Sequence, residues 1–263
     1  MAYFVGIDIG STCSKTAILD QDGKICRVSV MPTGWSSVET ARQIKKELEE
    51  QGIAPEEMTV VSTGYGRGSV SYADKAVTEI TCHARGAAFL EREKQLVIID
   101  IGGQDTKLIR LENGQVVDFM MNDKCSAGTG RFLEVMANSL AVDIEELCRL
   151  ARQGGGISIS AMCTVFAESE VISLMGKGES KENIAYGIID SIVQRVAGQA
   201  QRWDLRDSTI VLTGGLYRFD YIREKLAEKL KRPVTTNRYG HYAGAIGAAL
   251  TARSLQEKTE GVQ

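Results

Sequence analysis

Short apolar runs separated by turns follow the same order twice along this chain of 263 residues. In the first copy, three strand-like runs reach to about residue 30, helical spacing follows over 37–51, and another apolar run occupies 58–62. Short apolar runs bounded by turn residues are typical of β-strands, whereas apolar positions three and four apart indicate an amphipathic helix. The first part of the chain therefore predicts a βββαβ unit.

The second copy starts with three strand-like runs between residues 96 and 121. Helical spacing then extends over 129–203 before the next strand-like run, at 209–212. Two-residue sequences that favour a tight β-turn end a hairpin in each copy. They are Asp22-Gly23 and Asn113-Gly114.

The duplication predicts two α/β lobes, and a chain of this length can bury two modest cores. We expect the first lobe at 1–93 and the second at 94–263. The second lobe is expected to contain a helical insertion at about 122–203. A C-terminal helix at about 241–255 is expected to pack back on the first lobe.

Each copy also carries a polar loop directly after its first strand. The loops at 8–15 and 100–107 both begin Asp-Ile-Gly and end in Lys. A carboxylate at the end of a buried strand suits Mg²⁺ or its water ligands, and glycine lets backbone N–H groups approach phosphate oxygens. A single copy is equally a common hairpin ending, but two copies with lysine in register favour a nucleotide site. Asp8 and Asp100 are the candidate Mg²⁺ groups.

The residues predicted to line the phosphates are Gly10, Ser11, Thr12, Cys13, Ser14, Lys15, Gly102, Gly103 and Gln104. Lys15 and Lys107 are also compatible with solvated ion pairs. A third contact is predicted at 213–216, where Gly214 and Gly215 form a turn that opens a helix, and a helix N-terminus can face phosphate or ribose. An ordinary strand-to-helix turn is the alternative.

Composition narrows the function classes. The net charge is −3, and no basic patch is interleaved with aromatic residues, so nucleic acid is not an expected partner. No apolar stretch is long enough to cross a membrane, and we expect a cytoplasmic protein. In that compartment, six cysteines suit packing, metal binding or redox chemistry better than structural disulfides.

The two loops, the glycine turn at 213–216 and the glycine- and alanine-rich segment at 240–249 together resemble the actin-like ATPase superfamily. The resemblance implies two RNase H-like lobes with ATP in the cleft between them. The closing helix would match residues 242–250.

Cys125 and Cys163 each stand before a predicted helix. The unpaired N–H groups of a helix N-terminus favour an anionic thiolate or cluster. Two thiolates are half of a four-cysteine iron–sulfur site, which a twofold-related chain can complete. A buried small hydrophobe is the alternative for either cysteine, and no CxxC spacing supports zinc. The other four cysteines, Cys13, Cys26, Cys82 and Cys148, are interpreted as packing or loop residues.

The segments 122–134 and 163–170 resemble the activator ATPases of (R)-2-hydroxyacyl-CoA dehydratases and the ATPase subunits of benzoyl-CoA reductase, of the BadF/BadG/BcrA/BcrD type. The resemblance implies an oxygen-sensitive homodimer with one [4Fe-4S] cluster held by Cys125 and Cys163 of each subunit. It implies an ATP-driven one-electron donor that is loaded by ferredoxin or flavodoxin and delivers to an iron–sulfur dehydratase. Gln104 would orient the attacking water. Cys13 and His241 depart from the usual residues beside the nucleotide.

Other functions stay open at this point. A double-cubane cluster protein or benzoyl-CoA reductase is an alternative partner. A sugar or acetate kinase would need a substrate-binding insertion and a general base, for which the chain shows no obvious room. A chaperone or filament subunit would be a non-redox ATPase, and it predicts no effect of Cys125→Ser.

Overall fold

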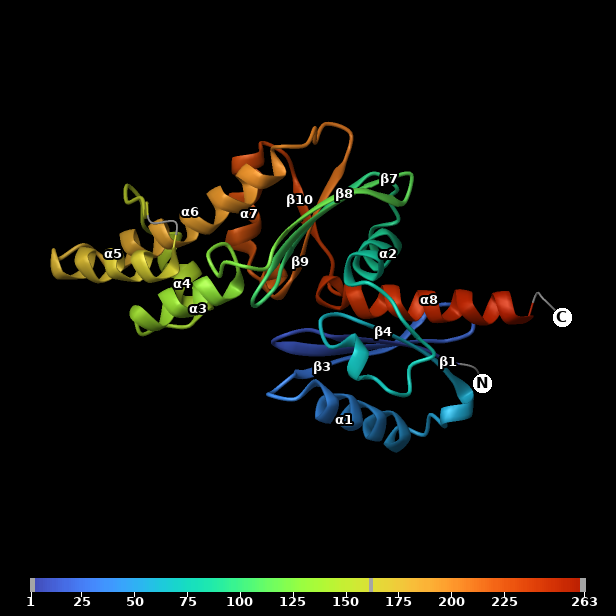
Figure 1. Cartoon of the computed structure of the whole chain (residues 1–263). Coiled ribbons are helices and arrows are strands. Elements are labelled where there is room, and N and C mark those ends of the chain that lie inside the picture. Colours follow the sequence, from blue (N-terminus) through green and yellow to red (C-terminus); the bar gives the residue numbers. More distant parts are fainter. Residues whose placement is uncertain (1–2, 161–162, 261–263) are drawn as a thin grey trace. The chain divides into compact units, whose positions relative to one another are not determined.

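The computed structural model describes residues 3–160 and 163–260, and residues 161–162 immediately before Cys163 lie outside the described part. The chain divides into two compact units (Figure 1). The first combines residues 1–94, 111–116 and 238–263, and the second combines 95–110 and 117–237. The C-terminal segment thus groups with the N-terminal one, as does the turn at 111–116, between the second and third strands of the second sheet.

The two sheets have the same topology. The order β3-β2-β1-β4-β5 in the first sheet corresponds, strand for strand, to β8-β7-β6-β9-β10 in the second. β1 is antiparallel to β2 and parallel to β4, and β6 is likewise parallel to β9. The first sheet consists of β1 (Tyr3–Ile9), β2 (Cys13–Leu19), β3 (Ile25–Pro32), β4 (Met58–Thr63) and β5 (Lys75–Ala76). The second consists of β6 (Leu96–Ile101), β7 (Thr106–Glu112), β8 (Gln115–Asn122), β9 (Thr209–Gly214) and β10 (Val234–Thr236).

Helices cover both faces of the first sheet. Alternate residues of β1 face opposite sides, so Val5, Ile7 and Ile9 pack in one cluster with α1 (Ser37–Glu50). Phe4 belongs to the other cluster, with α2 (Glu79–Glu91) and α8 (Ala243–Glu260). Short 3₁₀ turns lie at Pro55–Glu57, Arg67–Ser69 and Gly240–Tyr242.

Glycine lets α2 and α8 approach to backbone contact. A Cβ on Gly86 would overlap the carbonyl oxygen of Ala243, and a Cβ on Gly247 would overlap that of Cys82. The glycine- and alanine-rich composition of 240–249 therefore serves a close helix contact inside the first unit.

The helical insertion of the second unit consists of α3 (Gly130–Ser139), α4 (Ile144–Ala151), α5 (Thr164–Gly176) and α6 (Lys181–Ala200). It shares one core with a single face of β6, represented by Val97, Ile99 and Ile101, and with α7 (Asp220–Leu230). The fully buried Ile188 and Ile192 place α6 at the centre of this core.

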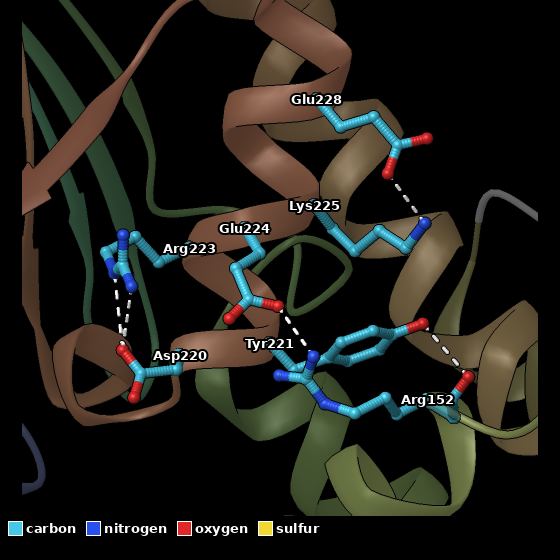
Figure 2. A network of polar contacts seen from close by, with 8 residues as sticks. Arg152, Asp220, Tyr221, Arg223, Glu224, Lys225 and Glu228 are labelled. Atoms are coloured by element: carbon cyan, nitrogen blue, oxygen red, sulfur yellow. Dashed lines mark hydrogen bonds and ion pairs between the residues drawn. The ribbon is translucent and has the colours of Figure 1, made fainter.

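Polar contacts tie α7 to the end of α4 (Figure 2). The Tyr221 hydroxyl donates to the carbonyl oxygen of Ala151 at 2.9 Å, and Arg152 pairs with Glu224 at 2.8 Å. The Arg152 guanidinium also lies 5.0 Å from the centre of the Tyr221 ring. The helix that follows β9 is thereby fastened to the insertion that carries the two candidate cysteines.

Within the described residues, none of the helices combines the length and apolarity that a membrane span requires.

Candidate nucleotide and cysteine sites

The first phosphate loop connects β1 and β2. Asp8 pairs across the strands with Lys15, so the two side chains lie on the same face of the sheet. The Gly10 N–H donates to the carbonyl oxygen of Cys13 at 3.2 Å and closes a tight turn in which Ser11 and Thr12 are exposed. The turn presents its backbone at the end of the hairpin, as a phosphate-binding loop requires.

Two glycines enclose the Asp8 carboxylate, which is only 6% exposed. A Cβ on Gly244 would stand 2.6 Å from Asp8 Oδ2, and a Cβ on Gly64 would overlap Oδ1. Gly64 also has φ +86°, a conformation that other residues rarely adopt. The turn that follows β4 therefore lies against the predicted metal-binding carboxylate.

Thr33 supports the same loop from the end of β3. Its hydroxyl donates to the carbonyl oxygen of Gly10 at 2.7 Å and is 2.8 Å from the hydroxyl of Ser14. Ser14 is 1% exposed, so its hydroxyl stabilises the loop from inside. The contact of Ser14 with phosphate stays a prediction.

The second loop, between β6 and β7, has an equivalent turn. The Gly102 N–H donates to the carbonyl oxygen of Asp105 at 2.9 Å, and Gln104 is exposed. Asp100 Oδ2 lies 3.2 Å from Lys107 Nζ, and its Oδ1 accepts from Thr213 Oγ1 at 3.2 Å. Lys107 also lies 2.8 Å from Asp105 and is 2% exposed. The ion pair that was the alternative for Lys107 is therefore confirmed, but it is buried and not solvated.

The glycine turn after β9 differs from the predicted one. Gly214 has φ +78°, and a Cβ there would stand 2.6 Å from Asp100 Oδ1. Gly215 opens a 3₁₀ turn at Gly215–Arg218, and α7 starts only at Asp220. The prediction that this turn directly opens a helix N-terminus is thus corrected, while its closeness to Asp100 keeps it beside the second loop.

His241 belongs to the first unit, in the 3₁₀ turn that precedes α8. It is half-buried, and its ring centre lies 5.5 Å from that of Tyr242.

The two candidate cysteines lie on neighbouring segments of the second unit. Cys125 is in the loop after β8, and Cys163 is the N-cap residue of α5. The hydroxyls of the next residues, Ser126 and Thr164, share a hydrogen bond of 2.8 Å although they are 38 positions apart. Cys163 is exposed and Cys125 half-buried. The fold thus brings together two thiol-bearing segments that the sequence separates.

Cys82 and Cys148 have a different environment. Both are buried inside helices, and burial raises the pKa of the Cys82 thiol to about 11 and that of Cys148 to about 12. These thiols stay protonated at neutral pH, as expected of packing residues. Cys13 is half-buried at the start of β2, and Cys26 is exposed in β3.

A chain of hydrogen bonds connects the second phosphate loop to the cysteine segments. The first N–H groups of α3, from Gly130 and Arg131, donate to the carbonyl oxygens of Gly102 and Gly103, both at 2.8 Å. The Thr129 hydroxyl donates to the Ser126 carbonyl oxygen at 2.7 Å, and Ser126 contacts Thr164 as described above. The sequence motifs gave no sign of this connection.

The donor set fits half of an iron–sulfur site. The two neighbouring segments carry the sulfurs of Cys125 and Cys163, and a [4Fe-4S] cluster takes four cysteine sulfurs. Over residues 3–160 and 163–260, no group of three or more His, Cys, Asp or Glu side chains is placed to hold a metal ion. Cys125 and Cys163 thus match such a cluster in the type of donor atom and account for two of its four positions.

Known proteins share this architecture. The chain is 45% identical over 253 residues to the (R)-2-hydroxyglutaryl-CoA dehydratase activating ATPase of Acidaminococcus fermentans, covering 95% of this chain and 96% of the relative. The crystal structure of that dehydratase's component A matches with a TM-score of 0.90 and 43% identity, over 98% of this chain and all of the other.

Two further solved structures bear on the fold. The activator of the 2-hydroxyisocaproyl-CoA dehydratase from Clostridium difficile, with bound ADPNP, matches at TM-score 0.89 and 40% identity over 99% of this chain and 98% of the other. A ROK family glucokinase from Streptomyces griseus, at TM-score 0.59 and 17% identity over 96% of this chain and all of the other, shares the fold alone. Both sheets and the actin-like ATPase architecture agree with the fold class expected from the sequence.

The sequence pattern of one family, described as the BadF/BadG/BcrA/BcrD ATPase family, matches residues 5–252, which is nearly the whole chain. The chain belongs to the BadF/BadG/BcrA/BcrD ATPase family.

Proposed function

We propose that this protein is an ATP-driven one-electron donor that activates an iron–sulfur enzyme of the 2-hydroxyacyl-CoA dehydratase type. Relatives over 40% identical are named as activators of such dehydratases, and one binds ADPNP. The observation that carries the proposal in this chain is the 2.8 Å hydrogen bond between Ser126 and Thr164, which brings the Cys125 and Cys163 segments together.

The nucleotide would be ATP with Mg²⁺. Asp8 and Asp100 are proposed to hold the metal through bound water, and exposed Gln104 to orient the attacking water. Gly214 and Gly215 are proposed to contact the adenosine, with His241 near the nucleotide. The residues proposed to line the phosphates are Gly10, Ser11, Thr12, Cys13, Ser14, Lys15, Gly102 and Gly103.

Cys125 and Cys163 are proposed to supply two of the four ligands of a [4Fe-4S] cluster shared with a second copy of the chain. When bound, the cluster supplies a one-electron donor of low potential. The exposure of α5 supports a second copy at this position. Phe166 and Val165 are 69% and 65% exposed directly after Cys163, and a large exposed apolar surface is typical of an interface.

The hydrogen bonds that the first N–H groups of α3 donate to the carbonyl oxygens of Gly102 and Gly103 give nucleotide a route to the cysteines. A change in the second loop would reach α3, then the Ser126 carbonyl oxygen, then α5. This path of contacts is continuous and lies within the second unit. Ferredoxin or flavodoxin is the proposed electron source, and ATP binding would reshape the cysteine segments that face the partner enzyme.

The experiment is anaerobic purification followed by iron and sulfide counts on the wild type, Cys125→Ser, Cys163→Ser and Cys26→Ser. We expect about two iron atoms per chain in the wild type and in Cys26→Ser, whose thiol is also exposed but lies in β3, and little iron in the other two variants. Bleaching on exposure to air should accompany loss of iron. A metal-free dimer with normal ATP hydrolysis, or full iron in Cys125→Ser, would refute the proposal.

A further inference from the structure

Arg195 reaches the candidate cysteine site from a distant part of the chain. It lies on α6, 70 positions after Cys125. Its Nη1 donates to the carbonyl oxygen of Ala127 at 3.1 Å and lies 3.8 Å from the sulfur of Cys125.

The surroundings fix the guanidinium in this position. Buried Ile192 and Val196 on the same helix anchor α6 in the core. Gly128 leaves the necessary space, because a Cβ there would stand 2.8 Å from Arg195 Cδ. Asn122 holds the same loop from its other end, donating to the carbonyl oxygens of Cys125 at 2.9 Å and Ala127 at 3.0 Å.

A guanidinium remains charged at every physiological pH and presents its donors in a rigid plane. Hydrogen bonds and positive charge at a ligand sulfur stabilise the more negative, reduced state of an iron–sulfur centre. Reduction adds one electron without forming or breaking a bond in the protein, so the effect of the cation is electrostatic.

We propose that Arg195 is a positioning residue that holds the Cys125 segment and raises the reduction potential of the cluster bound there. The inference rests on the proposed function. As a consequence, a biological electron donor can reduce the cluster before ATP is hydrolysed.

The test compares Arg195→Gln and Arg195→Lys with the wild type in the full-length protein, reconstituted with iron and sulfide without oxygen. A redox titration followed by electron paramagnetic resonance gives the midpoint potential. At a fixed potential, the ratio of reduced to oxidised cluster should fall about tenfold in Arg195→Gln, which is about 59 mV for one electron. Arg195→Lys should keep the charge and show a smaller shift.

Arg202→Gln is the matched control. It removes one positive charge from an exposed residue just beyond α6, in the same unit, and should change the ratio less than twofold. A wild-type midpoint in Arg195→Gln with iron retained would overturn the inference, as would an equal shift in Arg202→Gln. Loss of iron in Arg195→Gln with retention in Arg195→Lys would support the positioning role. A wild type that takes up no iron would instead reject the proposed function itself.

Discussion

Asp8 and Asp100 end the first strands of two sheets with the same topology, and both are buried, but different groups surround their carboxylates. In the first unit, the backbone at Gly64 and Gly244 closes around Asp8. In the second, Lys107 and Thr213 contact the two oxygens of Asp100. The hairpin backbone is therefore retained in both copies, while the neighbours described for the two carboxylates differ: glycine backbone at Asp8, and a lysine and a threonine at Asp100.

The lysines show the same contrast. Lys107 is buried between Asp100 and Asp105, whereas Lys15 is half-buried, with Nζ 3.7 Å from the position that a Cβ on Gly10 would take. A buried cation between two carboxylates is part of the structural framework. A partly exposed lysine beside a phosphate loop is better placed to meet a ligand.

The largest expected effect comes from removing the buried cation. Lys107→Met leaves Asp100 and Asp105 without the charge between them, and breaking a buried pair typically costs about 3–5 kcal/mol. We expect a correspondingly lower unfolding midpoint in urea, measured by circular dichroism. Lys15→Met is the matched variant and should change stability by less than about 1 kcal/mol while weakening nucleotide binding. Equal destabilisation by both variants would show that Lys107 and Lys15 do not differ in their contribution to stability.

Gly244→Ala tests the glycine enclosure of Asp8. The new Cβ would stand 2.6 Å from Oδ2, and the aspartate side chain can move away more easily than the backbone. A displacement of about 1 Å in a reacting group commonly costs about 100-fold, so phosphate release from ATP should fall by about that factor while the protein stays folded.

Gly198→Ala in α6 is the control for that substitution. A Cβ there meets no atom within 4 Å, and alanine is the better helix former. Its ATP hydrolysis should match that of the wild type. Undiminished hydrolysis by Gly244→Ala would show that the position of Asp8 is not critical.

The smallest effect concerns the buried thiols. Burial, with a smaller contribution from the charge of Asp8, raises the pKa of Cys82 to about 11, so the folded state holds this proton more tightly than the unfolded chain does. This stabilisation is complete below pH 9 and is lost as the pH rises toward 11. Asp8→Asn should lower the pKa of the Cys82 thiol, so that the thiol ionises at a lower pH than in the wild type.

Asp100→Asn is the comparison for this measurement, because Asp100 is not among the groups that raise the pKa of Cys82. The ionisation is followed by the ultraviolet absorbance of the thiolate as the pH rises. All variants carry Cys148→Ala, which removes the other buried helix thiol. A shift in Asp100→Asn as large as that in Asp8→Asn would contradict the assignment of the effect to the first loop.

Local sequence predicted much of this fold because each strand is a short apolar run and the turns carry their own signals. Asn113 and Gly114 both have positive φ, as their turn requires. The motif around Cys125 similarly indicated a cysteine site before any geometry was known. Both features depend on residues close together in the chain.

Long-range contacts could not be predicted in the same way. The burial of Lys107, the role of Thr33 behind Ser14 and the approach of Arg195 to Cys125 all join residues on different elements. No spacing rule links positions 125 and 195, since their contact depends on how α6 packs in the core. The turn at Gly215 was mistaken for a helix start because glycine and a following apolar residue suit a 3₁₀ turn equally well.

The position of α8 in the core of the first unit has a consequence for folding during translation. Ala245, Ile246 and Ala249 supply part of the core that covers Phe4 and Val61, almost at the opposite end of the chain. A nascent polypeptide emerges from the ribosome N-terminus first. The first sheet must therefore wait, with one apolar face uncovered, until the second unit has been translated and the last helix emerges, and a chaperone that shields this face would be most useful during that interval.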